Sequence, residues 1–194
     1  MAETKESVLS VHLGQVLMRL SETYPRLLET ILEMIQNAID GGATRVYVEL
    51  DLAAKKRWAL IADNGEGISP DKFSEALKLV GESQKLRENT LGRFGLGLIS
   101  PLAKVTKLRI ASFTKGRPVI EWVFNPDKIS KMAEGVSIPS SRLSSLPTPK
   151  GIWEGVNDWQ TCIRLEGITT DRTSSHIDLP DLKTRIDSGF GEAM

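Results

Sequence analysis

The chain is poor in cysteine and histidine, and neither sign of charge is in excess. Cys162 is the single cysteine of the 194 residues, so an internal disulfide is excluded and a reducing compartment is expected. Its run, residues 161–165, is typical of a strand, which predicts a buried structural thiol and not a nucleophile. Lys+Arg and Asp+Glu balance at 25 each. This excludes a global basic field for DNA or an anionic membrane, but leaves a local patch open.

Long apolar runs are also missing. No stretch approaches the roughly 20 apolar residues that cross a bilayer, and residues 1–10 lack the features of a secretion signal. A cytoplasmic protein without a membrane partner is therefore expected. We interpret His12 and His176 as incidental, because neither lies in a recognisable functional sequence. The length fits one compact domain with a short appendage.

Periodicity predicts helices and strands in alternation. Helices are expected at 8–20, at 26–40, and from Ser69-Pro70 onward. Strands are expected at 45–51, 58–62, 105–113, 119–124 and 161–165. The remaining segments are predicted to be a loop at 81–92, a short helix after the glycines that ends or bends at Pro101, a long connection at 125–150, and a short helix after Pro180. The predicted fold class is a two-layer α+β sandwich, a mixed and mostly antiparallel sheet with helices on one face.

The second predicted helix carries a polar stripe. Glu33 and Asn37 are four residues apart and so share a face, about 40° apart around the axis, and Asp40 continues the stripe. A solvated helix face explains such a stripe equally simply. A magnesium ion held mainly by phosphates and water needs one or two protein oxygens, and Asn37 can supply one. Glu33 can then take a proton from water.

Asp63 follows an apolar strand and begins the sequence Asp-Asn-Gly-Glu-Gly. A plain turn at a strand end is one interpretation. The other is a buried carboxylate that accepts a hydrogen bond from an exocyclic amine such as that of adenine. Gly65 and Gly67 would let the backbone approach the base, and Ile68 would pack on its ring.

A glycine-rich turn, Gly92-Arg93-Phe94-Gly95-Leu96-Gly97, precedes the short helix. It fits neither a dinucleotide-binding fingerprint nor a P-loop. Loop amides at a helix start still suit phosphate, and a flexible hinge is the simpler alternative. If 81–97 is a hinged loop, it can close over a nucleotide as a lid.

The three motifs in this order resemble the GHKL superfamily, whose nucleotide-binding domain has the Bergerat fold. Members include type II topoisomerases, ninety-kilodalton heat-shock chaperones, histidine kinases, MutL-type mismatch-repair proteins and Morc-type ATPases. Residues 28–51 are similar to the mismatch-repair and chaperone members, and GRFGLGLIS is closer to the chaperone and Morc types. The resemblance covers residues 26–113 and continues weakly to Leu165.

The resemblance implies a role for each motif. Glu33 would be the general base and Asn37 the Mg²⁺ ligand, with Asp40 beside them. The remaining ATP-binding residues would be Asp63, Gly65, Gly67, Ile68, Gly92, Arg93, Phe94, Gly95, Leu96, Gly97 and, on the last strand, Thr161. Such families often place a threonine near the adenine-binding aspartate, although Gln160 stands where a glycine is usual. Lys85 is expected to be a solvated loop lysine.

The implied domains are a helical arm at 1–24, an ATP-binding domain at 25–168 and a polar appendage at 169–194. The arm either mediates dimerisation or packs on its own domain. The expected function is slow, Mg²⁺-dependent ATP hydrolysis coupled to lid closure and to dimerisation or a protein partner. The alternatives are a non-hydrolysing ATP-responsive module and the ATPase part of a DNA-processing protein, which the neutral charge does not support. A histidine kinase is disfavoured, because such enzymes usually lack a glutamate at the position of Glu33.

Overall fold

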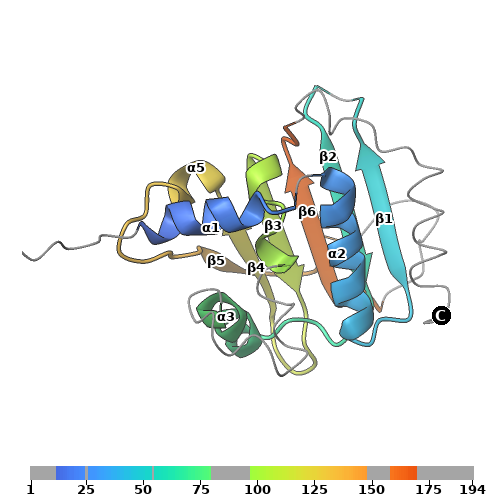
Figure 1. The fold of residues 1–194 in the computed structure, drawn as a ribbon. Helices are drawn as coiled ribbons and strands as arrows, with labels where there is room; N and C mark the ends of the chain where they lie inside the picture. The colour runs from blue at the N-terminus through green and yellow to red at the C-terminus, as the bar shows by residue number, and fades with distance from the viewer. Residues whose placement is uncertain (1–11, 25, 54, 80–96, 148–157, 170–194) are drawn as a thin grey trace, which may run out of the picture.

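The computed structural model describes residues 12–24, 26–53, 55–79, 97–147 and 158–169. In this part of the chain, helices cover one face of a six-stranded sheet (Figure 1). The helices are α1 (Leu13–Ser21), α2 (Leu27–Asp40), α3 (Pro70–Leu79), the 3-10 turn η1 (Leu102–Lys104) and α5 (Pro126–Ile129). The strands are β1 (Val46–Asp51), β2 (Trp58–Asp63), β3 (Lys107–Ser112), β4 (Val119–Phe124), β5 (Ser140–Leu143) and β6 (Thr161–Glu166). The predicted two-layer fold is confirmed.

The strand order is β1-β2-β6-β3-β4-β5, and every described pairing is antiparallel. The last strand of the chain therefore lies in the middle of the sheet, between β2 and β3. Its register places Thr161 opposite Asp63 on one side and opposite Ser112 on the other. The ends of three strands thus align in one row at one edge of the sheet.

Helix α2 packs on β2 (Figure 1), and its ends follow from local chemistry. The Arg26 N–H donates to the Glu29 carboxylate at 3.3 Å, which caps the first turn. At the other end the Gly42 backbone has φ +74, and its N–H donates to the Ile39 carbonyl at 2.9 Å. The sequence predicts both ends of α2 to within one residue.

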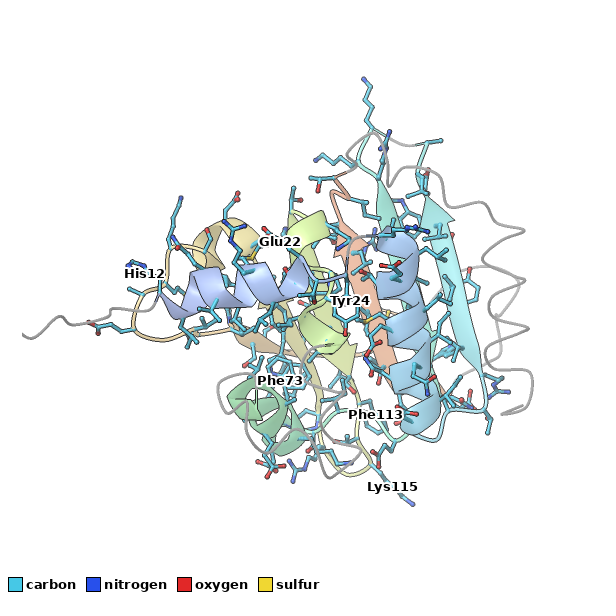
Figure 2. The ribbon with its side chains drawn as sticks, in the orientation of Figure 1. His12, Glu22, Tyr24, Phe73, Phe113 and Lys115 are labelled. Carbon is cyan, nitrogen blue, oxygen red and sulfur yellow. The ribbon has the colours of Figure 1, made fainter. Side chains whose placement is uncertain are left out.

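The core lies between the helices and the sheet. Its fully buried members include Ile31 and Met34 of α2, and Ile61, Ile110 and Leu165 of the strands. Burying each such side chain stabilises the fold by about 1.5–3 kcal/mol. Helix α3 contributes Phe73, whose ring stacks on Trp122 with 4.2 Å between centroids (Figure 2).

Helix α1 packs on its own domain. Its Leu13 and Gly14 N–H groups donate to the carbonyls of Ala133 and Met132 at 3.2 and 3.0 Å. A Cβ at Gly14 would overlap the Ile129 carbonyl, so the helix lies against the α5 backbone. Residues 13–21 thus pack on their own domain, as one of the two predictions for the arm states, and a dimerising role of the arm stays a prediction. The predicted helix began at 8, and residues 8–11 lie outside the described part; His12 is exposed at its start (Figure 2).

Two elements were missed in the segment predicted to be a long connection, 125–150. Helix α5 begins where the Asn125 side chain accepts the Lys128 N–H at 3.1 Å, with Pro126 in its first turn. Strand β5 pairs with β4 at the edge of the sheet, and its side chains are mostly exposed. An edge strand without a buried face shows no alternating apolar pattern, which is why periodicity did not reveal it.

On the sheet face away from the main core, Cys162 packs with Leu60 and Trp159. Its thiol is buried and donates to the Pro147 carbonyl at 3.0 Å, and burial raises its pKa to about 12. A thiol that stays protonated is a poor nucleophile. The prediction of a buried structural cysteine is confirmed. None of the helices in the described part is long and apolar enough to span a bilayer.

Candidate functional site

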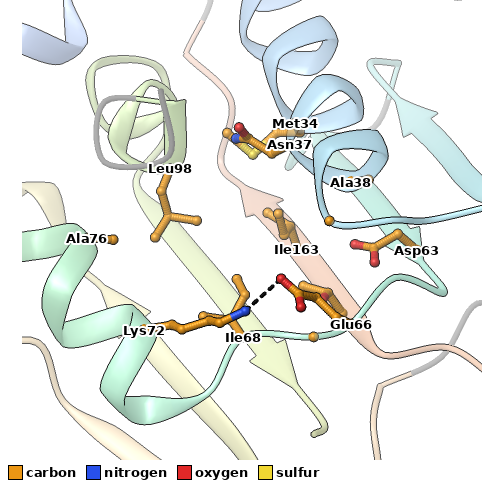
Figure 3. Close-up of a pocket in the computed structure, with 13 residues that line it drawn as sticks. Met34, Asn37, Ala38, Asp63, Glu66, Ile68, Lys72, Ala76, Leu98 and Ile163 are labelled. Atoms are coloured by element: carbon orange, nitrogen blue, oxygen red, sulfur yellow. Dashed lines mark hydrogen bonds and ion pairs between the residues drawn. The ribbon is translucent and has the colours of Figure 1, made fainter. Parts of the chain in front are cut away.

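A pocket opens between α2, α3 and the row of strand ends that contains Asp63 and Thr161 (Figure 3). Its walls are mostly apolar, with a few polar groups among them, which is the usual character of a small-molecule site. The lining residues are Met34, Asn37, Ala38, Gly41, Asp63, Glu66, Gly67, Ile68, Lys72, Ala76, Leu98, Thr161 and Ile163.

Asp63 is the buried acid of the pocket, with 8% of its surface exposed. One carboxylate oxygen, Oδ1, accepts the Gly65 N–H at 2.9 Å, and the Thr161 hydroxyl is a second partner. Burial raises the pKa of Asp63 to about 6, against the opposing effect of these two hydrogen bonds. The carboxylate form therefore predominates at neutral pH and can accept a further hydrogen bond from a ligand.

The turn after Asp63 requires its glycines. A Cβ at Gly65 would lie 2.8 Å from the Gly41 carbonyl oxygen. Gly67 has φ +73, and a Cβ there would overlap the Phe113 carbonyl. Asn64 holds the start of the turn, because its side-chain oxygen accepts the N–H groups of Thr44 and Arg45 at 2.9 and 2.8 Å. The motif thus fixes a backbone that wraps closely around one side of the pocket.

Asn37 presents a buried amide to the same pocket. It is 8% exposed, and neither its oxygen nor its nitrogen has a hydrogen-bond partner in the described part of the chain. Buried polar atoms are seldom left unpaired, so such an amide is suited to a ligand. The described residues contain no group of three or more His, Cys, Asp or Glu side chains that could hold a metal. An ion held here would thus be one that takes most of its ligands from phosphate and water, as Mg²⁺ does.

Gly97, the last residue of the glycine-rich motif, lies against the polar side chains of α2. A Cβ on this residue would lie 2.6 Å from Glu33 Oε1 and 2.8 Å from Asn37 Nδ2. Real Cβ atoms do not approach so closely, so the backbone after the glycine-rich turn packs directly on these two side chains. Glu33 and Asn37 lie on α2, and Gly97 follows Asn37 by sixty residues in the chain.

The predicted residues are not all brought to the pocket. Asn37, Asp63, Gly67, Ile68 and Thr161 line it. Glu33 lies beside it, against Gly97, and Gly65 shapes its wall through the backbone. Asp40 does not line the pocket: it is exposed, and its carboxylate accepts the Gln36 amide at 2.6 Å. Gly92 through Leu96, the 81–92 loop and Lys85 lie outside the described residues.

Several lining residues were missed by the sequence analysis. Met34 and Ala38 flank Asn37 on α2, and Ile163 follows Thr161 by two residues and so shares its sheet face. These positions could have been found by extending the helix and strand patterns. An ion pair at the mouth, Lys72 Nζ to Glu66 Oε1 at 2.7 Å, had no sequence signal (Figure 3).

Comparisons with known proteins identify the family of this chain. The profile of the family described as "Histidine kinase-, DNA gyrase B-, and HSP90-like ATPase" matches residues 26–148. The DNA mismatch repair protein MutL of Caulobacter vibrioides is 30% identical over 166 residues, 79% of this chain and 24% of MutL. MutL of Treponema pallidum is 28% identical over 151 residues, 75% of this chain and 23% of its own length. MutL of Exiguobacterium sibiricum is 37% identical over 95 residues, 46% of this chain and 15% of its own.

These three relatives are all DNA mismatch repair proteins. The chain spans about a quarter or less of the length of each relative. The matched region covers most of the described domain and all three motifs. The chain therefore belongs to the histidine kinase-, DNA gyrase B- and HSP90-like ATPase family, as its GHKL motifs predict, and is distantly similar to MutL.

Proposed function

We propose that this chain binds ATP with Mg²⁺ in the pocket beneath α2 and hydrolyses it slowly. The observation that carries the proposal is the contact of Gly97 with both Glu33 and Asn37. The last glycine of the third motif, a carboxylate, and a buried amide with no hydrogen-bond partner among the described residues then lie in one place. Asp63 supplies a base-reading group in the same pocket.

In this proposal, Asp63 accepts a hydrogen bond from the exocyclic amine of adenine. Gly67 and Ile68 line the base, and Thr161 holds the carboxylate from the neighbouring strand. A base that lacks the amine leaves the buried carboxylate without this hydrogen bond. Such a site therefore binds adenine in preference to bases without an exocyclic amine at that position.

At the other end of the nucleotide, Asn37 Oδ1 would hold Mg²⁺, and residues 92–97 would contact the phosphates. When bound, the ion would supply positive charge to the phosphate oxygens. Glu33 orients a water molecule and takes its proton. The proposal also includes closure of residues 81–97 over bound ATP. It further includes activation by dimerisation or by contact with a protein partner. Phosphate release per molecule across a dilution series measures whether dimerisation activates.

The magnesium assignment predicts the behaviour of Asn37→Ala. Binding of a non-hydrolysable ATP analogue should lose most of its dependence on Mg²⁺, with affinity roughly 10-fold or more weaker at saturating Mg²⁺. The ligand-free protein should be no less stable, because the amide makes no hydrogen bond in the described part of the chain. Isothermal titration with and without Mg²⁺ measures the first effect, and urea unfolding measures the second.

Gln36→Ala is the matched control. It removes an amide from the same helix, but one that donates to Asp40 and does not line the pocket. Binding of the ATP analogue by Gln36→Ala should depend on Mg²⁺ as it does in the parent protein. If analogue binding by Asn37→Ala kept its full dependence on Mg²⁺, the assignment of Asn37 as a metal ligand would be wrong.

A second candidate, the ATPase part of a DNA-processing protein, is favoured by one surface feature and by the similarity to DNA mismatch repair proteins. A cavity at the far end of the sheet is lined by five cations, with Glu166 as the acid among them. These cations are Lys55, Lys56, Arg57, Lys107 and Arg164. Arg164 also lies over the Trp58 ring, 5.3 Å from its centroid. The neutral net charge of the chain thus conceals a local basic cluster of the kind that contacts phosphates.

If this cluster contacts DNA, duplex DNA should bind at about 50 mM salt and weaken steeply by 200 mM. Reversing two charges, in Lys55→Glu with Lys56→Glu, should reduce that affinity by about tenfold or more and flatten the salt dependence. Lys115→Glu, at the exposed turn between β3 and β4, is the control and should bind like the parent (Figure 2). Absence of binding at 50 mM salt in a fluorescence anisotropy titration would reject this candidate.

A further inference from the structure

Ser112 is a buried hydroxyl that no motif identified. It is the last residue of β3, is 2% exposed, and lies in the row of strand ends opposite Thr161, which in turn lies opposite Asp63. A serine at the end of a strand is common and gave no signal in the sequence. Its contacts, however, join three segments that meet at the pocket.

The Ser112 Oγ accepts the Ile68 N–H at 2.7 Å and donates to the Gln160 carbonyl at 3.0 Å. It also lies 3.4 Å from the Thr161 hydroxyl oxygen. The first bond holds the end of the turn that follows Asp63. The second bond holds the residue before β6, and the third contact reaches the partner of the Asp63 carboxylate.

Gly67 fits into the same arrangement. A Cβ on Gly67 would lie 3.2 Å from Ser112 Oγ, so the turn passes directly over the hydroxyl. Both Gly67 and Ile68 line the pocket, whereas Ser112 itself does not. Ser112 can therefore act on a ligand only through the turn and through Thr161.

We propose that Ser112 is a positioning residue for recognition of the nucleobase. Its hydroxyl holds the Gly67–Ile68 backbone in a fixed position relative to the Thr161–Asp63 pair. The inference rests on the proposed ATP function and names a specificity determinant of the same site. Because Ser112 makes none of the contacts of Glu33 or Asn37, its loss acts on binding and base discrimination, and leaves the hydrolytic step unchanged.

Ser112→Ala tests this assignment. The dissociation constant for a non-hydrolysable ATP analogue and the KM for ATP should both rise roughly tenfold, with kcat within about twofold of the parent. The preference for ATP over inosine triphosphate, whose exocyclic group is an oxygen, should fall by a similar factor. Ser112→Thr keeps the hydroxyl and should recover most of both losses.

Ser100→Ala is the matched control. It deletes a hydroxyl that is equally buried but has no hydrogen-bond partner within the described residues, so affinity and preference should not change. If Ser112→Ala does not fold, Ser112→Cys replaces it with the same expectations, because a thiol is a weaker acceptor.

Three results would overturn the assignment. One is an unchanged KM and base preference in a folded Ser112→Ala. Another is a fall in kcat without a change in KM. The third is a Ser112→Thr variant that restores stability but not affinity. A parent protein that binds no ATP would overturn the proposed function as well, whereas a parent that binds ATP as tightly as Ser112→Ala would overturn this inference alone.

Discussion

Glu33→Ala should lower the rate of ATP hydrolysis by roughly 10²–10⁴ while leaving nucleotide affinity within about twofold of the parent. The expectation follows from the position of Glu33 beside Gly97 and outside the pocket lining. A carboxylate there can take a proton from water without contributing to the base or metal contacts. Phosphate release under saturating ATP gives the rate, and titration with the non-hydrolysable analogue gives the affinity.

Asp40→Ala is the control for this result, and it also tests the sequence analysis. Asp40 is a carboxylate of the same helix, but it is exposed and accepts the Gln36 amide. We expect its hydrolysis rate to equal that of the parent. Glu33→Gln, which keeps the shape of the side chain, should be as slow as Glu33→Ala if the proton acceptor is what matters.

Two other outcomes are informative. An unchanged rate in Glu33→Ala would show that another group acts as the base. A parent protein that binds ATP but releases no phosphate above background would favour the non-hydrolysing, ATP-responsive module. In that case there would be no hydrolysis for the variant to lose.

Asp63→Asn should weaken ATP binding by roughly 10- to 150-fold, the range for a lost hydrogen bond to a charged group. Asparagine keeps an oxygen for the Gly65 N–H, but it lacks the charge and presents an NH₂ group to the amine of adenine. Isothermal titration with the ATP analogue measures the loss. Equal affinity in the two proteins would contradict the adenine assignment.

The same substitution should stabilise the ligand-free protein. The pKa of Asp63 rises from 3.8 to about 6 on folding, so the folded state favours the protonated acid. The free energy of unfolding then carries this contribution below pH 4 and loses it as pH rises towards 6 and above. Two pKa units correspond to about 3 kcal/mol, which is the largest gain expected of Asp63→Asn at neutral pH.

Urea unfolding of both proteins at several pH values checks this second effect. The difference in free energy of unfolding should be near zero at about pH 3 and reach its plateau above about pH 7. Asp71→Asn is the control, because Asp71 has an 81% exposed side chain paired with Arg117. A difference between Asp63→Asn and the parent that does not vary with pH would refute the burial argument. If Asp63→Asn loses ATP binding but gains stability, then the Asp63 carboxylate serves ligand binding at a cost to the stability of the fold.

The sequence predicted the elements that bury one face. The periodicities of α2, β2 and β4 are local signals, and the structure follows the predicted ranges closely. The pairing of β6 between β2 and β3 is not local, because it joins Thr161 to residues about a hundred and about fifty positions earlier. The family resemblance suggested that Thr161 lies near Asp63; the register places the two residues opposite each other.

The outcome for Asp40 has a geometric reason. At about 100° per residue, Asp40 lies about 20° to one side of Glu33, and Asn37 lies about 40° to the other. Met34 and Ala38, which line the pocket, lie further round on the Asn37 side. The pocket thus faces the border between the polar and apolar stripes of α2, and not the centre of the polar one. Shared polarity alone could not distinguish these positions.

Ser112 and the Glu66–Lys72 pair could not be predicted for a different reason. Each depends on where α3 and β3 lie relative to the turn after Asp63, which is set by packing of the whole sheet. The basic cavity could not be predicted for the same reason. Lys107 and Arg164 come close to residues 55–57 only because of the order of the strands in the sheet. Sequence spacing carries no information about such neighbours.

The central claim is that residues of three motifs meet around one triphosphate. A crystal structure of the chain with a non-hydrolysable ATP analogue and Mg²⁺ tests it most directly. We expect the adenine amine at the Asp63 carboxylate, the metal at Asn37 Oδ1, and the γ-phosphate next to Glu33 and Gly97. A nucleotide bound elsewhere, or in this pocket with its base away from Asp63 and its phosphates away from Asn37, would contradict the account.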